Sequence, residues 1–280
     1  MAEIIDGKKI AKELNKKTLR EIEDLDGKRP GLAIILVGQK EDSKLYVDLK
    51  EKEARKVGIE THVYKCAEDT EEEKVLEIIE HLNVDDEIDA ILVQLPLPKN
   101  FNTSKIIKAI ELKKDVDLFH PENIKILQST CSHNHMMPPV LGVVLEMLEK
   151  INFDAKEKTG CVIANSDIFG ESLAKVLQCK GMHIESCGPD DADLVEKTLK
   201  ADVLISAIGR PGFVGAEMVK NDAVVIDVGI TKRGKKVLGD VDFDDVEKKA
   251  SYITPVPGGV GPATVAMLLL NTVRLATNNK

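Results

Sequence analysis

Apolar runs of strand length alternate with amphipathic segments of helix length in this 280-residue chain, and this alternation constrains the fold most. The run from Gly31 to Val37 is apolar throughout, as expected of a strand buried on both faces. In the first part of the chain the pattern predicts helices over 8–25, 42–57, 71–82 and 103–111, and strands over 31–37, 59–65 and 90–94. Strands that alternate with helices favour an α/β fold with a mostly parallel sheet covered on both faces.

The alternation restarts after a loop-like stretch at 120–139, which indicates a second domain. Beyond it the pattern predicts helices over 140–151, 170–180, 191–200 and 263–276, and strands over 161–164, 183–187, 203–207 and 223–228. This second series is typical of a Rossmann-type domain. We therefore expect two domains, residues 1–121 plus 263–280 and residues 122–262, with the C-terminal helix returning to the first.

Charge and composition argue against several classes of protein. The chain has 39 Lys and Arg against 48 Asp and Glu, a net charge of −9, no Trp, three Tyr and six Phe. Nucleic-acid binding usually needs a basic face and stacking aromatic rings, so it is not expected. The N-terminus lacks a secretory signal, and no apolar run approaches the roughly 18 residues of a membrane span. Five cysteines without a Cys-x-x-Cys pair favour a reducing cytoplasm.

The stretch from Tyr252 to Pro262 is rich in both proline and glycine. Three prolines and three glycines fall between Pro255 and Pro262. Proline restricts the backbone, while glycine permits close approach of another group. Composition alone leaves two interpretations open, a stiff loop pressed against a flat ligand and a rigid connector between domains.

One predicted helix carries a candidate acid/base residue. Tyr46 and Lys50 are four residues apart in the helix over 42–57, so they share a face and could meet one ligand. Ser43 is a plausible N-cap of this helix and Gly58 stands at its C-terminal end. The alternative is a solvated charge, because the helix also carries other basic residues, namely Lys44, Lys52, Arg55 and Lys56.

Polar residues follow the predicted strand over 90–94 and the next helix. Gln94 stands at the carboxyl end of its strand, where parallel sheets bind ligands, although an amide there could simply cap the sheet. Asp115 and Asp117 precede the suspected domain junction. They could orient a ligand or satisfy backbone N–H groups of a turn.

Together these motifs resemble the bifunctional methylenetetrahydrofolate dehydrogenase/methenyltetrahydrofolate cyclohydrolase family over nearly the whole chain. The segments that carry the resemblance are Ser43–Lys52, Ile91–Pro98, Lys114–Asp117, Asp227–Ile230, Gly239–Val241 and Thr254–Pro262. The resemblance implies a cytoplasmic homodimer that binds a folate and serves one-carbon metabolism, including purine biosynthesis. Two rival functions are a cyclohydrolase without hydride transfer and a non-catalytic folate-binding protein.

The resemblance also implies roles for the site residues. Lys50 would be the general acid/base of the cyclohydrolase step, Tyr46 would stack on the folate, and Gln94 would hydrogen-bond near Lys50. Asp117 would hold the polar edge of the pteridine ring. Along the folate would lie the loop residues Pro257, Gly258, Gly259, Val260 and Gly261.

For the dinucleotide, NADP or NAD, the resemblance implies contacts from Ala164, Asn165, Ser166, Gly170, Asp190 and Ile230. Two features depart from the usual pattern of the family, since Ala164 replaces a glycine and Asp167 adds a negative charge. No Lys or Arg occurs between Ile184 and Glu196, while Asp190 and Asp191 follow the second Rossmann strand. A 2′-phosphate prefers a cation and a free ribose diol prefers an acid, so the local residues favour NAD, or weak dinucleotide binding altogether. The alternative is that a distant cation, such as Arg210 or Lys232, folds into the site.

Other departures lie outside these contacts. Leu118 stands where the family has a glycine, which matters if the position needs a positive φ. The family's threonine before the second domain is missing, since the chain reads Pro138, Pro139, Val140 and Leu141. Cys131, His133 and His135 could face a metal ion, but they lack a fourth ligand and the family needs none, so an exposed polar loop without metal is expected.

Overall fold

The computed structural model describes residues 1–25, 27–131, 136–234 and 236–278. The chain divides into two compact units. The first, called the Rossmann unit below, comprises Met1–Ala11, Leu127–Ser132 and Val140–Thr264. The second, called the three-stranded unit, comprises Lys12–Ile126, His133–Pro139 and Val265–Lys280.

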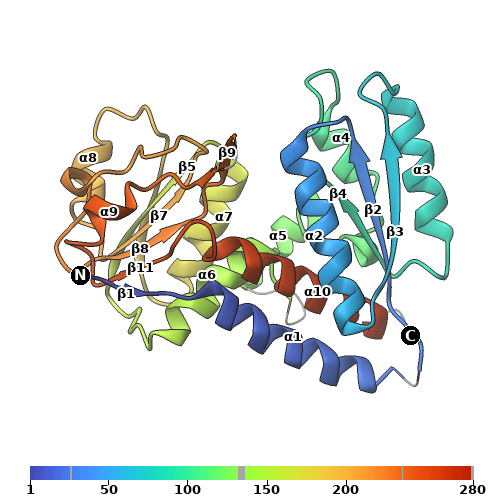
Figure 1. The fold of residues 1–280 in the computed structure, drawn as a ribbon, viewed down its shortest axis with the longest axis horizontal. Helices are drawn as coiled ribbons and strands as arrows, with labels where there is room; N and C mark the ends of the chain where they lie inside the picture. The colour runs from blue at the N-terminus through green and yellow to red at the C-terminus, as the bar shows by residue number, and fades with distance from the viewer. Residues whose placement is uncertain (26, 132–135, 235, 279–280) are drawn as a thin grey trace. The chain divides into compact units, whose positions relative to one another are not determined.

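The three-stranded unit is built on a parallel sheet of order β3-β2-β4 (Figure 1). Its strands are β2 (Gly31–Val37), β3 (Glu60–Cys66) and β4 (Ala90–Val93). The helices of this part of the chain are α1 (Gly7–Glu23), α2 (Glu41–Val57), α3 (Glu72–Val84), α4 (Thr103–Lys108), η1 (Leu112–Lys114) and α5 (Pro121–Thr130). The predicted β/α alternation and parallel pairing are confirmed, because each crossover between strands is a helix.

The central strand β2 explains why both faces of this sheet are covered. All seven of its residues are buried. Leu32, Ile34 and Leu36 belong to one apolar cluster and Ala33, Ile35 and Val37 to another, since side chains of a strand alternate between faces. The second cluster is completed by residues of α3, Val75, Ile79 and Leu82.

Helix α10 (Val260–Asn278) supplies the other face of this core. Leu268, Leu269 and Val273 pack in one cluster with Leu32 and Ile34, which confirms that the C-terminal helix returns to the first part of the chain. By length and hydropathy α10 alone among the described helices could cross a membrane, but 72% of that window is buried inside the protein. It is a core helix, and its apolar character serves packing.

The Rossmann unit contains a parallel sheet of order β1-β11-β8-β7-β5-β6. The strands are β1 (Glu3–Ile4), β5 (Thr159–Ala164), β6 (His183–Cys187), β7 (Val203–Ala207), β8 (Val224–Asp227) and β11 (Tyr252–Ile253), with a hairpin of β9 (Thr231–Arg233) and β10 (Lys236–Leu238). Its helices are α6 (Pro139–Lys150), α7 (Asp167–Gln178), α8 (Leu194–Thr198), η2 (Ala216–Met218) and α9 (Phe243–Val246). The strand order reverses at β5, so the carboxyl ends of β5 and β7 form a topological switch point, where such sheets bind ligands.

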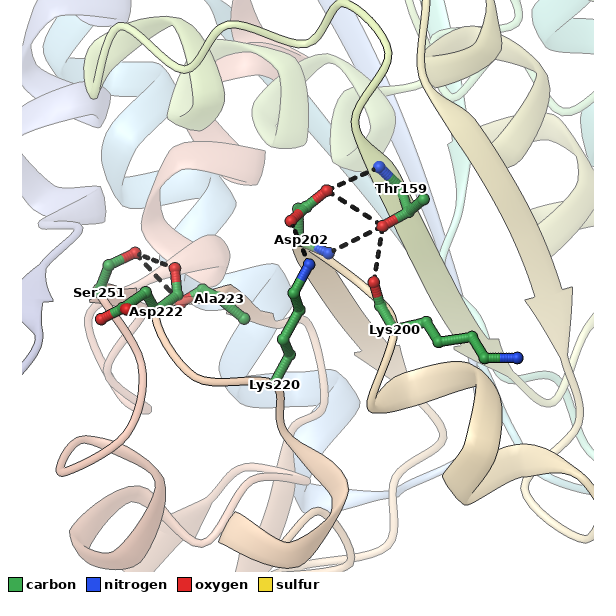
Figure 2. Close-up of polar contacts among 7 residues, drawn as sticks. All are labelled: Thr159, Lys200, Asp202, Lys220, Asp222, Ala223 and Ser251. Carbon is green, nitrogen blue, oxygen red and sulfur yellow. Dashed lines mark hydrogen bonds and ion pairs between the residues drawn. The ribbon is translucent and has the colours of Figure 1, made fainter.

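Polar contacts fasten the opposite, amino ends of these strands. Figure 2 shows Asp202 between Thr159 and Lys220, with its carboxylate 2.9 Å from the Thr159 backbone N and 2.7 Å from Lys220 Nζ. Burial alone raises the pKa of Asp202, but the bonds from Lys220 and Thr159 outweigh it and lower the pKa. Ser251 Oγ donates a hydrogen bond of 2.8 Å to the carbonyl of Asp222, so the start of β11 is bonded to the segment just before β8.

Two local predictions are wrong. The stretch expected as a loop, residues 120–139, contains helix α5 over Pro121–Thr130. This helix is short, so its apolar pattern repeats only a few times. Lys40, not Ser43, is the N-cap of α2, and Ser43 is buried inside the helix. The predicted end of this helix is confirmed, since Gly58 follows α2 with a φ of 84°.

Two of the five cysteines are bonded to each other. Cys131 and Cys179 form a disulfide, with their Cα atoms 6.0 Å apart. They are separated by 48 residues, and only the fold brings the ends of α5 and α7 together. Cys66, Cys161 and Cys187 are free.

Candidate active site

Lys50 and Gln94 meet in the three-stranded unit. Helix α2 places Lys50 where its side chain is only 9% exposed, and Gln94 directly follows β4. Lys50 Nζ donates a hydrogen bond of 2.7 Å to Gln94 Oε1, and Gln94 Nε2 donates one of 2.7 Å to the carbonyl of Leu95. Because the second bond fixes the orientation of the amide, its oxygen is held toward the lysine.

The environment of Lys50 shifts its amine toward the neutral form. Burial lowers the pKa of Lys50, while the charge of Asp117 raises it and so limits the shift. The pKa of Asp117 rises to about 6, chiefly through burial, with Lys50 lowering it and Asp115 raising it further. The lysine and the carboxylate therefore influence each other's protonation within one site.

Asp115 shapes the turn that carries Asp117. Its buried carboxylate accepts hydrogen bonds from the backbone N–H of Leu118 at 3.1 Å and of His120 at 2.8 Å, and from Asn123 Nδ2 at 2.8 Å. Leu118 adopts a φ of 57° with its side chain 2% exposed in the core. The position that is glycine in the family pattern does have a positive φ here, at a cost of roughly 1–2 kcal/mol for a leucine.

Some of the predicted residues interact within the three-stranded unit, and others belong to the Rossmann unit. Lys50, Gln94 and Asp117 interact, and Tyr46 lies one turn before Lys50 on α2 with a partly buried ring. The predicted folate loop, residues 257–261, belongs to the Rossmann unit.

Close packing explains the glycines of that loop. A Cβ on Gly259 would stand 2.6 Å from the carbonyl oxygen of Pro255, and one on Gly7 only 1.7 Å from the carbonyl oxygen of Gly259. The Val256–Pro257 peptide is cis, and α10 begins at Val260, three residues before the predicted helix start. Glycine at positions 7 and 259 therefore permits close contacts that a side chain would block.

The turn after β5 fits a dinucleotide. Ser166 caps α7 by accepting a bond from Phe169 N, and Asn165 Nδ2 donates to the carbonyl of Ile208 at the end of β7. A Cβ on Gly170 would stand 2.2 Å from Ser186 Oγ, so this glycine permits the close approach of helix and sheet that dinucleotide-binding turns use. The N-terminus of α7 would face the pyrophosphate, although Asp167 stands in its first turn.

Two buried aspartates fix the loops at the carboxyl edge of this sheet. Asp240 accepts bonds from Ser206 Oγ at 3.0 Å and from the backbone N–H of Ile208 and Arg210, both at 2.8 Å. Asp227 accepts backbone bonds of 2.9–3.0 Å from Gly229, Asp240 and Val241, and burial raises its pKa to about 7. Ile230 follows this turn and is partly exposed, so its side chain can reach a ligand.

Arg210, one of the two distant cations that the sequence left open for this site, does reach the dinucleotide turn. Its guanidinium forms two bonds with the Asp190 carboxylate, of 2.8 and 3.0 Å. The two residues are 20 positions apart, so no short motif could have revealed the pair. Asp191 instead accepts a bond of 3.0 Å from the backbone N–H of Gly188.

The suggested metal cluster has no structural support in the described residues. The sulfur of Cys131 is bonded to Cys179, while His133 and His135 lie outside the described part of the chain. Among the residues that the structure does describe, no group of three His, Cys, Asp or Glu side chains could hold a metal ion.

Comparisons with known proteins agree on one family. The catalytic-domain model of the tetrahydrofolate dehydrogenase/cyclohydrolase family matches residues 5–117, and its NAD(P)-binding-domain model matches residues 139–280. The bifunctional protein FolD of a Nitratiruptor species is 43% identical over 282 residues, covering 99% of each chain.

Solved structures give the same result. The FolD methylenetetrahydrofolate dehydrogenase/cyclohydrolase from Campylobacter jejuni superposes with a TM-score of 0.94 at 37% identity over 100% of both chains. The Trypanosoma brucei FolD, solved with NADP cofactor and an inhibitor, also has a TM-score of 0.94, at 33% identity over 99% of this chain and 98% of its own.

Fold and site together define a two-unit α/β enzyme with a Rossmann-type dinucleotide-binding unit. The chain belongs to the tetrahydrofolate dehydrogenase/cyclohydrolase family. It is a bifunctional methylenetetrahydrofolate dehydrogenase and methenyltetrahydrofolate cyclohydrolase that uses a nicotinamide cofactor and a folate substrate.

Proposed function

We propose that the chain oxidises 5,10-methylenetetrahydrofolate, preferably with NAD, and hydrolyses 5,10-methenyltetrahydrofolate to 10-formyltetrahydrofolate with Lys50 as the acid/base group. The observation that carries the second step is the hydrogen bond of 2.7 Å from the buried Lys50 to Gln94. An isolated surface lysine would have neither the burial nor the fixed partner.

Hydrolysis requires proton transfer while water attacks the methenyl carbon. The neutral amine of Lys50 can accept a proton from that water and later return it, and burial increases the neutral fraction by lowering the pKa. Gln94 holds the amine in one direction through its oxygen. Tyr46 would support the folate ring, and Asp117 would accept hydrogen bonds from its amino edge.

The oxidation step needs position more than proton transfer. A bound nicotinamide dinucleotide would accept a hydride from the methylene carbon. Ala164, Asn165, Ser166, Gly170 and Ile230 would hold this cofactor, while residues 257–261 would lie along the folate. The domain boundaries expected from the sequence, 1–121 plus 263–280 and 122–262, remain our proposal for the folate and dinucleotide parts.

Replacing Lys50 tests the hydrolysis mechanism. Lys50→Met keeps much of the side-chain length but cannot exchange a proton, so the hydrolysis rate should fall by roughly 10²- to 10⁴-fold while folate still binds. The matched control is Lys56→Met, which removes an exposed lysine of the same helix, paired with Glu53. Near-normal hydrolysis by Lys50→Met would end the assignment.

The preference for NAD rests on charge at the adenosine end of the turn. Asp190, three residues after β6, has a side chain that is 79% exposed, and Arg210 is already bonded to it. A doubly charged 2′-phosphate would meet this carboxylate at a cost in repulsion, whereas a ribose diol can donate hydrogen bonds to it. Measured with each cofactor at equal folate concentration, kcat/KM should be higher with NAD, and a clear preference for NADP would contradict the proposal.

We also propose that the enzyme is a homodimer in the cytoplasm. The family resemblance supports both, and the buried position of α10 is consistent with a soluble protein. Sedimentation equilibrium would test the dimer. Fractionation of the source cells would test the location.

A further inference from the structure

The carboxyl ends of β6 and β7 bring Asp190 and Arg210 together beside the switch point of the Rossmann sheet. β7 pairs with β5 from Gly160↔Val203 to Ala164↔Ala207, so the chain after β7 leaves the sheet next to the dinucleotide turn. β6 pairs with the other side of β5. In dinucleotide-binding sheets an acid on the turn after the second strand meets the adenosine ribose.

Several contacts fix Arg210 at this place. Its backbone N–H donates a hydrogen bond of 2.8 Å to the buried carboxylate of Asp240. Its guanidinium carbon lies 5.7 Å from the centroid of the Phe213 ring. The anchored backbone and the ring restrict the side chain, so the guanidinium presents both donors to Asp190. The hydrogen bonds from Arg210 lower the pKa of Asp190, which is therefore ionised at neutral pH.

The pair remains open to a ligand. The Asp190 side chain is 79% exposed and that of Arg210 is 44% exposed. A carboxylate offers about four acceptor positions and Arg210 uses two, so about two remain for ribose hydroxyls. The neighbouring Asp191 accepts a hydrogen bond from the backbone N–H of Gly188 in its own loop. The nearby Lys197 forms salt bridges with Asp193 and Glu185.

We propose that the Asp190–Arg210 ion pair selects the dinucleotide: Asp190 accepts the ribose hydroxyls of NAD and occupies Arg210, so that NADP can bind only by displacing Asp190 from it. The inference rests on the proposed preference for NAD and names the residues that produce it. Asp190 repels the 2′-phosphate and also withholds the cation that would otherwise bind that phosphate.

Direct binding of NAD and of NADP to the purified protein without folate tests the pair. Asp190→Ser frees Arg210, so the ratio of NADP to NAD affinity should rise on the order of 10- to 100-fold, the value of a charge-assisted bond to phosphate. Arg210→Ala leaves the Asp190 carboxylate without its cation and should lower the ratio of NADP to NAD affinity. Calorimetric or fluorescence titration gives the dissociation constants.

The matched control is Asp193→Ser, which removes an exposed carboxylate three residues away that is paired with Lys197. It should change the ratio less than about threefold, since its salt bridge is of the ordinary surface kind. A double variant of Asp190 and Arg210 should bind the two dinucleotides with similar affinity. Far-UV circular dichroism checks that each variant is folded, and Asp190→Asn is a second test of the same carboxylate.

Each outcome decides the matter. If Asp190→Ser behaves like Asp193→Ser, or if Arg210→Ala and Asp190→Ser shift the ratio in the same direction, the inference is wrong while the proposed function stands. If the unmodified protein prefers NADP but the two variants shift the ratio in opposite directions as stated, the preference for NAD is wrong and the role of the pair stands. If it binds neither dinucleotide, both are wrong, and hydrolysis of methenyltetrahydrofolate still tests Lys50 separately.

Discussion

At the scale of single residues, the site depends on one coupled pair of charges. Lys50 is held by Gln94 and its pKa is lowered by burial, yet the charge of Asp117 opposes that shift. Asp117 in turn has a pKa of about 6 because it is buried. The protonation of either residue therefore depends on the other.

Asp117→Asn should change both binding and the pH profile of hydrolysis. In the proposed function Asp117 accepts hydrogen bonds from the pteridine edge, so without this carboxylate the dissociation constant of a folate analogue should rise roughly 10- to 100-fold. Since Asp117 raises the pKa of Lys50, its removal lowers that pKa further, and the rise of kcat/KM with pH should move to lower pH. Titration with the analogue and rates across pH measure the two effects.

Asp69→Asn serves as the control for this experiment, because Asp69 is an exposed aspartate in the same unit. It should leave the dissociation constant and the pH profile unchanged. An Asp117→Asn protein that also matched the unmodified protein in both measurements would return Asp117 to a turn-forming role.

At the scale of helices and strands, the sequence predicts the long buried elements well. The apolar runs over 31–37 and 203–207 match β2 and β7 at both ends, because burial on two faces requires nearly continuous apolar sequence. The predicted strand over 183–187 also matches β6, although only two of its five residues are buried. The two-residue strands β1 and β11 were not predicted. Two residues carry no periodicity, and each strand depends on partners far away in the chain, as Glu3 does on Tyr252.

The site likewise contains residue pairs within one helix and residue pairs that join different elements. Tyr46 and Lys50 share one helix, so their spacing alone predicts a common face. The bond from Lys50 to Gln94 spans 44 residues and the pair of Asp190 with Arg210 spans 20. Sequence reasoning therefore reached the first only through a family pattern, and for the second it could only name Arg210 as one of two distant candidates. Contacts between elements depend on the whole fold, and spacing within one element cannot reveal them.

The disulfide between the ends of α5 and α7 should contribute measurably to stability. Closing a loop of 48 residues limits the unfolded chain and stabilises the native state by about 4 kcal/mol in the chain-entropy model. Reductant should therefore lower the unfolding free energy of the unmodified protein, and Cys131→Ser should lower it to a similar value that reductant no longer changes. Urea unfolding followed by circular dichroism gives these values.

Cys66→Ser is the matched control, since Cys66 is a free and partly buried cysteine. Its unfolding free energy should respond to reductant as that of the unmodified protein does. If reductant has no effect on the unmodified protein, Cys131 and Cys179 are not bonded in solution. A reducing cytoplasm would open this bond, so the reduced value is the relevant one there.

At the scale of the whole molecule, buried carboxyls determine how stability varies with pH. Burial raises the pKa of Asp117 to about 6 and that of Asp227 to about 7, from about 3.9 in an unfolded chain. The native state then binds protons more tightly, so their stabilisation is complete below about pH 4 and is lost as pH rises toward 7. The carboxyls with the opposite, lowered pKa are Glu72, Glu77, Glu122, Asp190, Asp193 and Asp202.

The unfolding free energy should therefore pass through a maximum near pH 5. The carboxyls with lowered pKa stabilise the protein above about pH 4 and lose that effect in acid, whereas Asp117 and Asp227 destabilise it between about pH 5 and 7. The raised pKa of Asp227 should account for a loss of about 2–4 kcal/mol in unfolding free energy as pH rises toward 7. Denaturant unfolding at a series of pH values measures the curve.

Asp227→Asn should flatten the decline between pH 5 and 7, while Asp222→Asn, at an exposed site, should leave it unchanged. A free energy that instead rises steadily from pH 5 to pH 8 would contradict the expected maximum.

The return of α10 to the three-stranded unit also affects the order of events during synthesis on the ribosome. The sheet residues Leu32, Ile34 and Leu92 leave the ribosome early, but Leu268, Leu269 and Val273, which cover the same face, are made last. At about 5–20 residues per second, the roughly 150 residues between Leu118 and Val265 take about 7–30 s to make. During that interval one apolar face of the nascent sheet lacks its covering helix, so this half of the enzyme can complete its core only after the Rossmann unit has been translated.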